Sequence, residues 1–486
     1  MAVTINRSNI KLSPDHKKVI PRFFNTGNER SHQLILKILQ LDDTCVETLL
    51  HNVFSEFSGR YQNIEAVFLQ HYQEIEHLLT EKDKSTLSGN KMLLTGAYFT
   101  MEYSIESAAL FNPSIVEDIN QSGADKEEKK VIVSFRATGE SHISSIVFKR
   151  GIIKRDGSIH FEPSGKFIAE GAVTQRERKS KAAFRKVLTH VNFPEEILLN
   201  ILDQLNDQFS YKELETALKN SLPAIGSPAE EMKLKHEIFS TVNTSYEIHF
   251  DTNSLLSERV IFPVTGAEKN GMEDARFVQF KEDDGKLSYI ATYTAYDGSV
   301  ILPQLIITKD FCHFKIAPLH GKGAVNKNLA LFPRKINGKY AMLSRIDGIN
   351  NYIMLSDDLY IWEGATLLQQ PKYPWEFVQI GNAGSPVETE KGWLVITHGV
   401  GPMRKYCLGA SLFDLNDPTI ELGRLREPLL MPDEDERDGY VPNVVYSCGS
   451  IIHGNKLFIP YAVSDYASSF ATVSLNELLD TLLESK

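Results

Sequence analysis

Apolar residues recur at helical spacing in two stretches of the chain. From about residue 31 to 80 they return every three or four positions with few Gly or Pro between them, which predicts amphipathic helices. A second such stretch covers about 175–238 and opens with the basic run Arg176, Arg178, Lys179 and Lys181. Charge runs of this kind are typical of a solvated helix face. We therefore expect an N-terminal helical region over 1–100 and a helical insertion at about 175–238.

Most of the remaining chain has the pattern of β-strands arranged in a repeat. Four segments share the order apolar strand, Gly-containing turn, apolar strand and third strand; they are 276–307, 329–355, 385–415 and 443–475. The turn glycines are Gly285, Gly338, Gly392 and Gly454. A Gly-containing turn between apolar runs indicates a hairpin, and a period of roughly 55 residues favours a radial array of blades.

A fifth, less regular copy precedes these four. It consists of 112–116, 131–136 and 143–153, and the helical insertion falls between it and the next copy. The fold class that we predict is an all-β core, a five-bladed β-propeller over 101–486, with the N-terminal helical region and the helical insertion attached. A propeller gathers the starts of its inner strands around one channel, so that is where we look for chemistry.

Composition narrows the class of protein. Hydrophobic residues make up 42% and aromatic residues 10%, as in an ordinary globular protein. The formal net charge of −11 argues against a nucleic acid or an anionic membrane as partner. The four cysteines have no C-x-x-C spacing, so neither a metal site nor a disulfide framework is indicated. The chain has no signal-peptide pattern and no long apolar run, and we expect a soluble cytoplasmic protein.

Polar residues stand where the predicted inner strands begin. They include Asn112 with Arg136, Glu273–Arg276, Lys327 with Asn328, Gly384–Pro386, His398, Tyr440–Asn443 and Asp465. Within Glu273–Arg276, strand alternation would point Asp274 and Arg276 to one side and Glu273 to the other. A carboxylic acid beside a cation suits proton donation in glycoside cleavage, although the same pair also serves to close a turn.

Five ordered motifs resemble glycoside hydrolase family 130, the inverting mannoside phosphorylases and β-mannosidases. They are Gly271–Arg276, Tyr293–Gly298, Lys327–Pro333, Gly392–Val400 and Tyr440–Tyr446. The resemblance extends from about 105 to 475. It implies a five-bladed propeller with a central site for a β-mannoside.

The resemblance also implies roles for individual residues. Asp274 matches the family's acid, which passes its proton through the 3-hydroxyl of the mannosyl unit to the glycosidic oxygen, and Asp465 matches an Asp that binds a sugar hydroxyl. The further candidate substrate contacts are Asn112, Arg136, Glu273, Arg276, Tyr296, Asp297, Asn328, Tyr440 and Asn443.

Phosphate is the expected second reactant. In a phosphorylase it attacks the anomeric carbon and needs a cluster of cations but no catalytic base. Lys327 and Arg345 match phosphate-site positions of the family, and His398 and Arg404 are further candidates, although His398 is equally compatible with a scaffold role. Ser344 stands where many family phosphorylases carry His, which loosens the phosphate assignment.

Three functions follow from these observations. We predict an inverting phosphorylase that cleaves β-mannosides, with β-1,2-linked manno-oligosaccharides expected, and releases α-mannose 1-phosphate. The alternative is an inverting β-mannosidase, which needs a carboxylate base; the candidates by residue type are Glu363, Glu376, Glu436 and Asp438. The third is a non-catalytic glycan-binding propeller. No metal or organic cofactor is predicted, and we expect the helical blocks to form a homo-oligomer or to wall the site.

Overall fold

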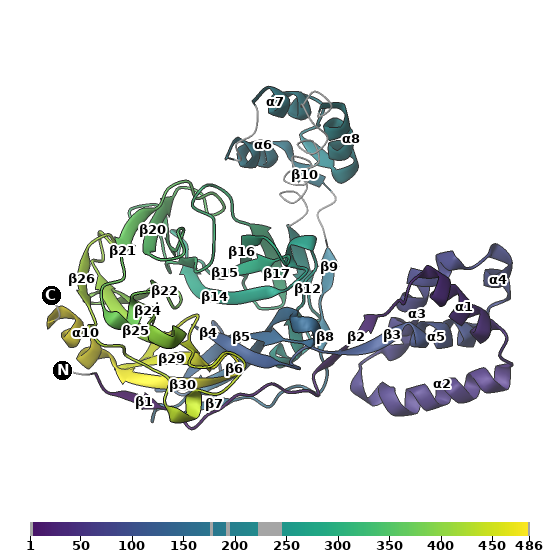
Figure 1. The fold of residues 1–486 in the computed structure, drawn as a ribbon, viewed down its shortest axis with the longest axis horizontal. Helices are drawn as coiled ribbons and strands as arrows, with labels where there is room; N and C mark the ends of the chain where they lie inside the picture. The colour runs from purple at the N-terminus through teal and green to yellow at the C-terminus, as the bar shows by residue number, and fades with distance from the viewer. Residues whose placement is uncertain (1–2, 175–177, 191–194, 222–244, 485–486) are drawn as a thin grey trace.

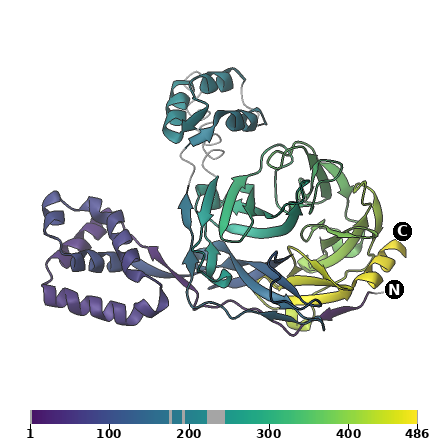
Figure 2. The same cartoon turned by 180° about the vertical axis from the view of Figure 1, so that it is seen from behind.

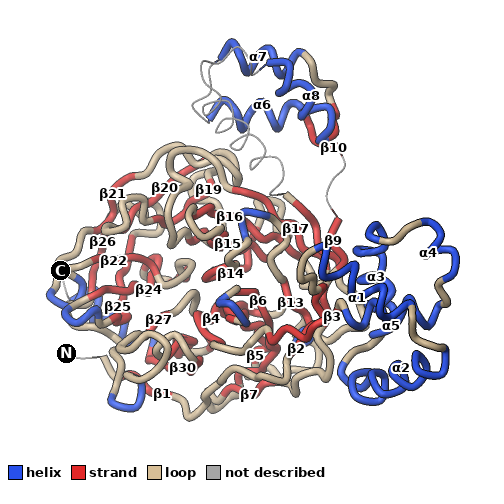
Figure 3. The backbone as a smooth tube through the Cα atoms, turned by 45° about the vertical axis from the view of Figure 1, so that its right-hand side comes forward, coloured by secondary structure: helices blue, strands red, loops and turns tan. Residues whose placement is uncertain are grey.

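The structure is a computed structural model that describes residues 3–174, 178–190, 195–221 and 245–484. It is mostly β: five larger sheets surround a common centre, and two groups of helices lie outside them (Figure 1). The tube view separates the strands from the two groups of helices (Figure 3). The mostly β core and the N-terminal helices agree with the predicted fold class.

The N-terminal helices form a small packed unit of their own. They are α1 (Asn28–Leu39), α2 (Asp43–Phe57), α3 (Ile64–Ile75), α4 (Glu81–Thr86) and α5 (Gly89–Tyr98). The Asp42 side chain accepts a hydrogen bond from the backbone N–H of Cys45, which caps α2. A two-stranded ribbon of β2 (Val19–Phe23) and β3 (Thr100–Ser104) joins this unit to the sheets, and Figure 2 shows the unit standing to one side of them.

The second group of helices has a separate apolar core. It contains β10 (Arg178–Ser180), α6 (Lys181–His190), α7 (Glu195–Asp203), β11 (Gln208–Ser210) and α8 (Tyr211–Ser221). Buried Phe184, Leu198 and Phe209 pack together inside it. Lys186 on α6 forms an ion pair with Asp358, which lies outside this group of helices. Arg176 and the 222–238 part of the predicted insertion lie outside the described residues.

The first two sheets are the largest. Sheet 1 consists of β4 (Ala109–Glu117), β5 (Lys129–Thr138), β6 (Ser144–Ile153), β7 (Ile159–Phe161), β8 (Ala169–Glu170) and β13 (Arg259–Ile261). Sheet 2 consists of β9 (Ala172–Thr174), β12 (Tyr246–His249), β14 (Met272–Lys281), β15 (Leu287–Tyr296), β16 (Ile301–Thr308) and β17 (His313–Pro318). Buried Phe148 of sheet 1 stacks on Phe314 of sheet 2, so the two sheets share an apolar core.

The other three sheets correspond to the predicted repeat segments 329–355, 385–415 and 443–475. Sheet 3 has β18 (Ala330–Leu331), β19 (Tyr340–Ser344), β20 (Asn351–Ser356) and β21 (Thr366–Gln369). Sheet 4 has β22 (Gln379–Asn382), β23 (Val387–Thr389), β24 (Gly392–Val400), β25 (Tyr406–Phe413) and β26 (Glu421–Arg424). Sheet 5 has β1 (Ile5–Arg7), β27 (Val445–Tyr446), β28 (Ile451–His453), β29 (Lys456–Val463) and β30 (Ala467–Ser474), followed by α10 (Leu475–Glu484).

Contacts between neighbouring sheets run in a closed circle. β4 packs against β14, β15 against β18, β20 against β22, β25 against β27, and β29 against β4. β1, from the start of the chain, pairs antiparallel with β30 near its end. The first strand of the chain therefore belongs to the same sheet as the last, and this sheet meets sheet 1.

Each sheet has a residue with a left-handed backbone at the strand that ends its strand order, which is β4, β14, β18, β22 or β27. Asn112 lies within β4, Asp274 within β14, Asn328 just before β18, Gly384 just after β22 and Asn443 just before β27. Their φ angles are 48°, 55°, 69°, 130° and 62°. Asn, Asp and Gly are the residues that adopt this conformation most readily. The repeat thus bends the chain at a comparable place in every sheet.

We expect Arg424→Met to destabilise the fold strongly. Arg424 donates to the fully buried Glu376 carboxylate at 2.6 Å, and the two side chains are only 5% and 0% exposed. Without the guanidinium, the Glu376 charge stays buried without a cation, which costs about 3–5 kcal/mol of the free energy of unfolding. Urea denaturation measures the loss.

The matched control is Arg334→Met. Arg334 pairs with Glu388, but these side chains are 38% and 43% exposed, so that the loss is expected to stay below about 1 kcal/mol. Equal losses in the two variants would contradict the assignment of the Arg424 ion pair as a structural one.

Candidate active site

The loop that leads into β14 is fixed by hydrogen bonds to a buried carboxylate and by close backbone packing. The buried Glu268 carboxylate accepts hydrogen bonds from the hydroxyls of Tyr246 and Tyr293 and from the backbone N–H of Thr265. Gly271, with a φ of 123°, lies against Ser144, whose backbone nitrogen would be 2.6 Å from a Cβ at this position. Only glycine fits this approach. The motif residues Tyr293 and Gly271 thus fix the backbone immediately before the acidic pair.

Glu273 and Asp274 both contact Arg136. Arg136 donates to Glu273 Oε1 at 2.9 Å and lies 3.4 Å from Asp274 Oδ1. The prediction from strand alternation, with Glu273 on the side away from Asp274, was wrong. The left-handed backbone of Asp274 and a register shift between Glu273 and Arg276 interrupt the alternation.

Side chains from three sheets meet at these carboxylates. Asn112 Nδ2 of sheet 1 donates to Asp274 Oδ1 at 2.6 Å. Lys327, just before sheet 3, forms an ion pair with Glu273 Oε2 at 2.5 Å. The Asp274 side chain is 13% exposed, so it is largely enclosed by polar groups but accessible to solvent.

Asp274 is held in its ionised form in the free protein. Burial by itself would raise the pKa of this carboxyl, but the charges of Arg136, Arg276 and Lys327 and the hydrogen bond from Asn112 lower the pKa below its usual value. A proton on Asp274 would therefore require that this field of cations be weakened.

Asp465 has the opposite balance. Burial, followed by the negative charge of Asp274, raises the pKa of Asp465 to about 6, while Arg136 and Arg404 oppose the rise. Arg404 itself is exposed on the loop between β24 and β25. The structure thus brings Asp465 into electrostatic range of the acidic pair and Arg404 into range of Asp465. A proton is favoured on Asp465 rather than on Asp274.

Tyr446 lies at the centre of a buried network. Its hydroxyl accepts hydrogen bonds from Arg276 Nη2 at 2.7 Å and from Asn328 Nδ2 at 2.8 Å. Arg276 also donates to the Asp274 carbonyl at 2.9 Å. Asn328 and Asn382 each donate to the other's backbone carbonyl, at 3.1 and 2.6 Å. This network joins sheets 2, 3, 4 and 5, and Arg276 connects it to the backbone of Asp274.

His398 supports Arg345. The fully buried imidazole has Nδ1 2.9 Å from the Asn382 carbonyl and Nε2 3.3 Å from Arg345 Nη1. A carbonyl only accepts and a guanidinium only donates, so Nδ1 carries the proton and Nε2 accepts. Burial, with Arg345 and Arg276 nearby, moves the pKa of His398 well below its usual value. Both ring nitrogens are therefore used within the protein.

Several buried polar atoms around this network lack a hydrogen-bond partner among the described residues. They are Asn112 Oδ1, Arg276 Nε, Ser344 Oγ, Arg345 Nε and Ser385 Oγ. Buried polar groups are normally paired, and unpaired ones indicate a missing water or ligand. Two of these atoms belong to guanidinium groups, which suits an anion.

Four predicted residues make no side-chain contact with the acidic pair among the described interactions, and they are Tyr296, Asp297, Tyr440 and Asn443. The Tyr296 hydroxyl donates to the Gly298 carbonyl, and Asp297 accepts hydrogen bonds from Ser299 and Val300, so both organise the turn between β15 and β16. Tyr440 is 57% exposed, and its hydroxyl lies 3.3 Å from His142 Nδ1. Asn443 acts through its backbone, which binds Arg437 and Tyr406.

Two carboxylates considered as bases have structural partners. Glu376 binds Arg424, and Glu436 accepts hydrogen bonds from Arg7 and from the Tyr461 hydroxyl.

The sequence analysis missed Tyr446 and Asn382. Tyr446 ends one of the family-like motifs, so its place in that motif was the available signal, whereas no sequence signal pointed to Asn382.

In the described part of the chain, no group of three His, Cys, Asp or Glu is placed to hold a metal ion, and no helix is long and apolar enough to cross a membrane.

Comparison with known proteins identifies a family. The model of glycoside hydrolase family 130, described as beta-1,4-mannooligosaccharide phosphorylase, matches residues 236–484. A beta-1,2-mannobiose phosphorylase of Listeria innocua is 33% identical over 233 residues, which are 46% of this chain and 63% of that protein. A 1,2-beta-oligomannan phosphorylase of Thermoanaerobacter sp. is 34% identical over 235 residues, which are 46% of this chain and 75% of that protein.

The similarity to solved structures is lower. The Listeria innocua beta-1,2-mannobiose phosphorylase in complex with beta-1,2-mannobiose superposes with a TM-score of 0.45 and 24% identity, over 78% of this chain and 93% of that one.

Tyr446→Phe is expected to destabilise the protein by roughly 1–3 kcal/mol, because Arg276 and Asn328 would each lose a buried acceptor. Chemical denaturation measures the free energy of unfolding. Tyr352→Phe is the matched control, since its hydroxyl binds the exposed Asp347 and its loss is expected to cost less than about 1 kcal/mol. A Tyr446→Phe protein as stable as this control would refute the network.

Asp465→Asn is expected to flatten the pH dependence of stability. The pKa of Asp465 is raised to about 6 in the folded protein, so the folded state keeps a proton that the unfolded chain has lost. Its contribution to the free energy of unfolding is therefore highest below the unfolded pKa and falls as pH rises from about 4 to 6, by roughly 2–3 kcal/mol. The Asn variant lacks this fall and is more stable than the parent protein at pH 7.

Urea denaturation at a series of pH values in phosphate-free buffer tests this. Asp357→Asn, at an 82% exposed side chain, should keep the parent's profile. A parental slope between pH 4 and 6 in Asp465→Asn would show that another group is responsible.

Proposed function

The chain belongs to glycoside hydrolase family 130, and from this premise we propose that it is an inverting phosphorylase of β-mannosides, acting on β-1,2-linked manno-oligosaccharides. The linkage is suggested by two relatives named above, a β-1,2-mannobiose phosphorylase and a 1,2-β-oligomannan phosphorylase. The stretch matched by the first covers 63% of that relative's length, so the argument for activity rests on the residues of this chain.

The observation that carries the proposal is the cluster of cations around Asp274. Arg136, Arg276 and Lys327 all lower the pKa of this carboxyl, and Arg345 lies close enough to Arg276 for the two charges to interact. Together these four cations outnumber the three carboxylates of the site, Glu273, Asp274 and Asp465. The guanidinium groups of Arg276 and Arg345 also have unpaired Nε atoms. An excess of buried positive charge with free donors favours an oxyanion such as phosphate.

In the proposed reaction, phosphate and Asp274 act on opposite faces of the mannosyl unit. A phosphate oxygen, held by Lys327 and Arg345, attacks the anomeric carbon as the bond to the glycosidic oxygen breaks. The Asp274 proton passes through the sugar's 3-hydroxyl to that leaving oxygen. The attacking hydrogen phosphate later gives up its own proton, which restores Asp274. The products are α-mannose 1-phosphate and the shortened saccharide, and no water is consumed.

Phosphate binding would also supply the proton donor. Asp274 is ionised in the free protein because of its cationic neighbours. A bound phosphate dianion partly cancels that positive field, which raises the pKa of Asp274 and lets it take a proton. His398 would then hold Arg345 in place rather than bind phosphate itself, and Tyr446 would do the same for Arg276 and Asn328. We assign sugar contacts to Asn112, Asp465 and the exposed Tyr440.

The closed circle of five sheets supports the inference of a five-bladed β-propeller, with 101–486 as the catalytic domain and the helical units 1–100 and 175–238 as additions to it. β1 belongs to the last sheet, so the propeller would include the first residues of the chain. The left-handed residues stand at corresponding end strands of the five sheets, which supports the inference that these strands would surround a central channel.

Hydrolysis is the competing function. It requires a carboxylate base, and of the candidates Glu376 and Glu436 are committed to Arg424 and to Arg7 with Tyr461. No observation on the described residues favours a base at Glu363 or Asp438, and the excess of cations favours phosphate over water.

Incubation of the purified protein with β-1,2-mannobiose is expected to give mannose 1-phosphate in the presence of phosphate and no reaction without it. Asp274→Asn should lower turnover by about 10²–10⁴-fold, because the amide has no proton to donate, while the protein stays folded with some loss of stability, because Arg136, Arg276 and Lys327 lose a counter-charge. Anion-exchange chromatography of the products and denaturation curves provide the two readouts.

A variant further along the sequence serves as control. Asp284→Asn changes an exposed carboxylate in the turn between β14 and β15 and should leave turnover unchanged. Release of free mannose without phosphate would establish hydrolysis instead, and full activity of Asp274→Asn would remove Asp274 from the mechanism.

A further inference from the structure

Three turns between neighbouring strands contain two consecutive non-glycine residues with a left-handed backbone. They join β5 to β6 in sheet 1, β24 to β25 in sheet 4 and β29 to β30 in sheet 5. All six φ angles lie between 48° and 60°. Sheets 4, 5 and 1 follow one another in the circle of sheets, so the three turns belong to adjacent sheets. The pairs are Ser141 with His142, Met403 with Arg404, and Ser464 with Asp465.

The corresponding turns of sheets 2 and 3 use glycine instead. Gly298, between β15 and β16, has a φ of 101°, and Gly348, between β19 and β20, has a φ of 78°. Glycine adopts a left-handed backbone without steric cost, whereas a β-carbon makes this conformation unfavourable. Side chains such as those of His142 and Arg404 therefore occupy positions where the backbone would favour glycine. Residues strained in this way cluster at ligand-binding sites.

Two of the three turns share one backbone pattern. In the turn 139–143 the first residue donates its N–H to the carbonyl of the fifth at 2.9 Å, and the fifth donates back to the second at 3.3 Å. The turn 401–405 repeats both hydrogen bonds, at 3.0 and 3.2 Å. The fourth residue of each turn is basic and exposed, and it is His142 in the first and Arg404 in the second. The same local geometry thus presents one basic side chain from sheet 1 and one from sheet 4.

His142 lies beside residues that we assign to the mannoside site. Its ring centre is 5.6 Å from that of Tyr440, and its Nδ1 is 3.3 Å from the Tyr440 hydroxyl. The N–H of Val441 donates to the Ser464 carbonyl at 3.0 Å. Tyr440 and His142 are therefore next to the turn that carries Asp465.

Arg404 acts on Asp465 from the other side. Its positive charge opposes the rise of the pKa of Asp465, so the two side chains are within electrostatic range. They form no ion pair among the described residues, so the Arg404 donors are not committed to this carboxylate. The cations that act most strongly on Asp274 are others. The sequence suggested Arg404 for the phosphate position, but its place beside Asp465 favours the saccharide.

The exposed side chains suit a neutral, hydroxyl-rich ligand. Tyr440 is 57% exposed, and its ring can pack on the apolar face of a sugar. The Arg404 guanidinium has several N–H donors for hydroxyl groups, and His142 directs Nδ1 at Tyr440, which leaves Nε2 to exchange a hydrogen bond with a hydroxyl. The nearby carboxylate of Asp465 disfavours an anion at this place.

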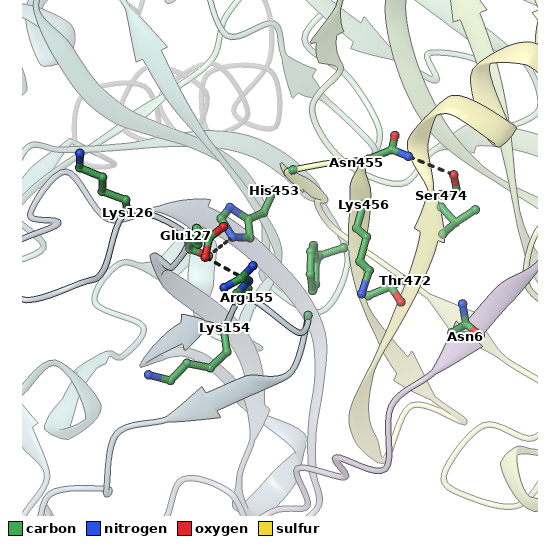
Figure 4. A pocket seen from close by; sticks show the side chains of 14 residues that line it. Asn6, Lys126, Glu127, Lys154, Arg155, His453, Asn455, Lys456, Thr472 and Ser474 are labelled. Carbon is green, nitrogen blue, oxygen red and sulfur yellow. Dashed lines mark hydrogen bonds and ion pairs between the residues drawn. The ribbon is translucent and has the colours of Figure 1, made fainter.

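The cavity where sheets 1 and 5 meet has a different character (Figure 4). It has a volume of about 610 Å³, and the three turns with paired left-handed residues do not line it. Two of its cations are matched by carboxylates, because Arg155 pairs with Glu127 at 3.0 Å and Lys154 with Glu128 at 2.6 Å. We assign no ligand to this cavity.

We propose that His142 and Arg404 bind the saccharide that leaves in the reaction, with the Tyr440 ring packed against it, and thereby determine which leaving groups are accepted. This assignment rests on the mannoside activity proposed above. The mannosyl unit lies at Asp274 and Asp465, and the next sugar unit lies toward the two basic turns. The left-handed backbone holds both turns in one conformation before the saccharide binds, which lowers the entropy lost on binding.

Steady-state kinetics in both directions test this assignment. His142→Gly and Arg404→Gly each remove a basic side chain and relieve the left-handed strain, so the free energy of unfolding should stay equal or rise. Each variant should raise the KM for β-1,2-mannobiose about tenfold or more, as a lost hydrogen bond to the sugar predicts, and leave the KM for phosphate within about twofold. In the synthetic direction, the KM for the acceptor mannose should rise and that for α-mannose 1-phosphate should not.

Ser141→Gly and Met403→Gly are the matched controls, because they relieve the strain at the neighbouring position and keep the basic side chain. Both should retain the parent's KM values. The proposal is overturned if the controls raise the KM for saccharide as much as His142→Gly and Arg404→Gly do. It is also overturned if these two variants keep the parental KM for saccharide, or raise the KM for phosphate or α-mannose 1-phosphate instead.

Failure of the proposed phosphorylase activity gives a different result. If water replaces phosphate, no mannose 1-phosphate forms, and the KM for β-1,2-mannobiose in His142→Gly and Arg404→Gly still decides the assignment of the leaving saccharide. If the parent protein cleaves no mannoside, both proposals are wrong.

Discussion

The arrangement of the site depends on one backbone feature, the left-handed residue at one end strand of each sheet, namely β4, β14, β18, β22 or β27. At Asp274 this conformation shifts the register of β14 against β15, so that adjacent carboxylates can both reach Arg136. At Asn112 it accompanies a similar shift in β4 against β5. Asn, Asp and Gly occupy these positions because other side chains meet a steric cost there. A repeated constraint of the fold thereby becomes a means of presenting polar side chains.

The second determinant is electrostatic. Arg136, Arg276 and Lys327 keep Asp274 ionised, and burial together with the Asp274 charge keeps a proton favourable on Asp465. In the free protein the cations near Asp274 are therefore available to an anion in our proposal, and Asp274 is ionised and has no proton to donate. Anion binding changes that balance, which would link occupancy of the phosphate position to proton donation. Such linkage needs no movement of the backbone, only a change in the local field.

Support for this arrangement comes from buried groups that never touch a substrate in our proposal. Tyr446 and His398 are both hydrogen-bonded within the protein and hold Arg276 and Arg345 respectively. The pairing of β1 with β30 brings strands from near the two ends of the chain into one sheet. The helical units remain outside the circle of sheets, and their role in oligomerisation or in walling the site stays a prediction.

The sequence by itself determined the elements and the residue types. Apolar spacing predicted both helical regions, turn glycines such as Gly285 and Gly338 predicted hairpins that the structure has at those places, and Asn or Asp at the strand starts marked the polar ring. It could not give side-chain direction, because the simple alternation expected around Asp274 fails where the backbone turns left-handed. It also could not reveal that His398 is tied to Asn382 and Arg345, or that Glu376 and Glu436 are bound by arginines. Those facts depend on which strands and sheets become neighbours, and only the tertiary structure decides that, because residues from 16 to 429 positions apart come into hydrogen-bonding distance.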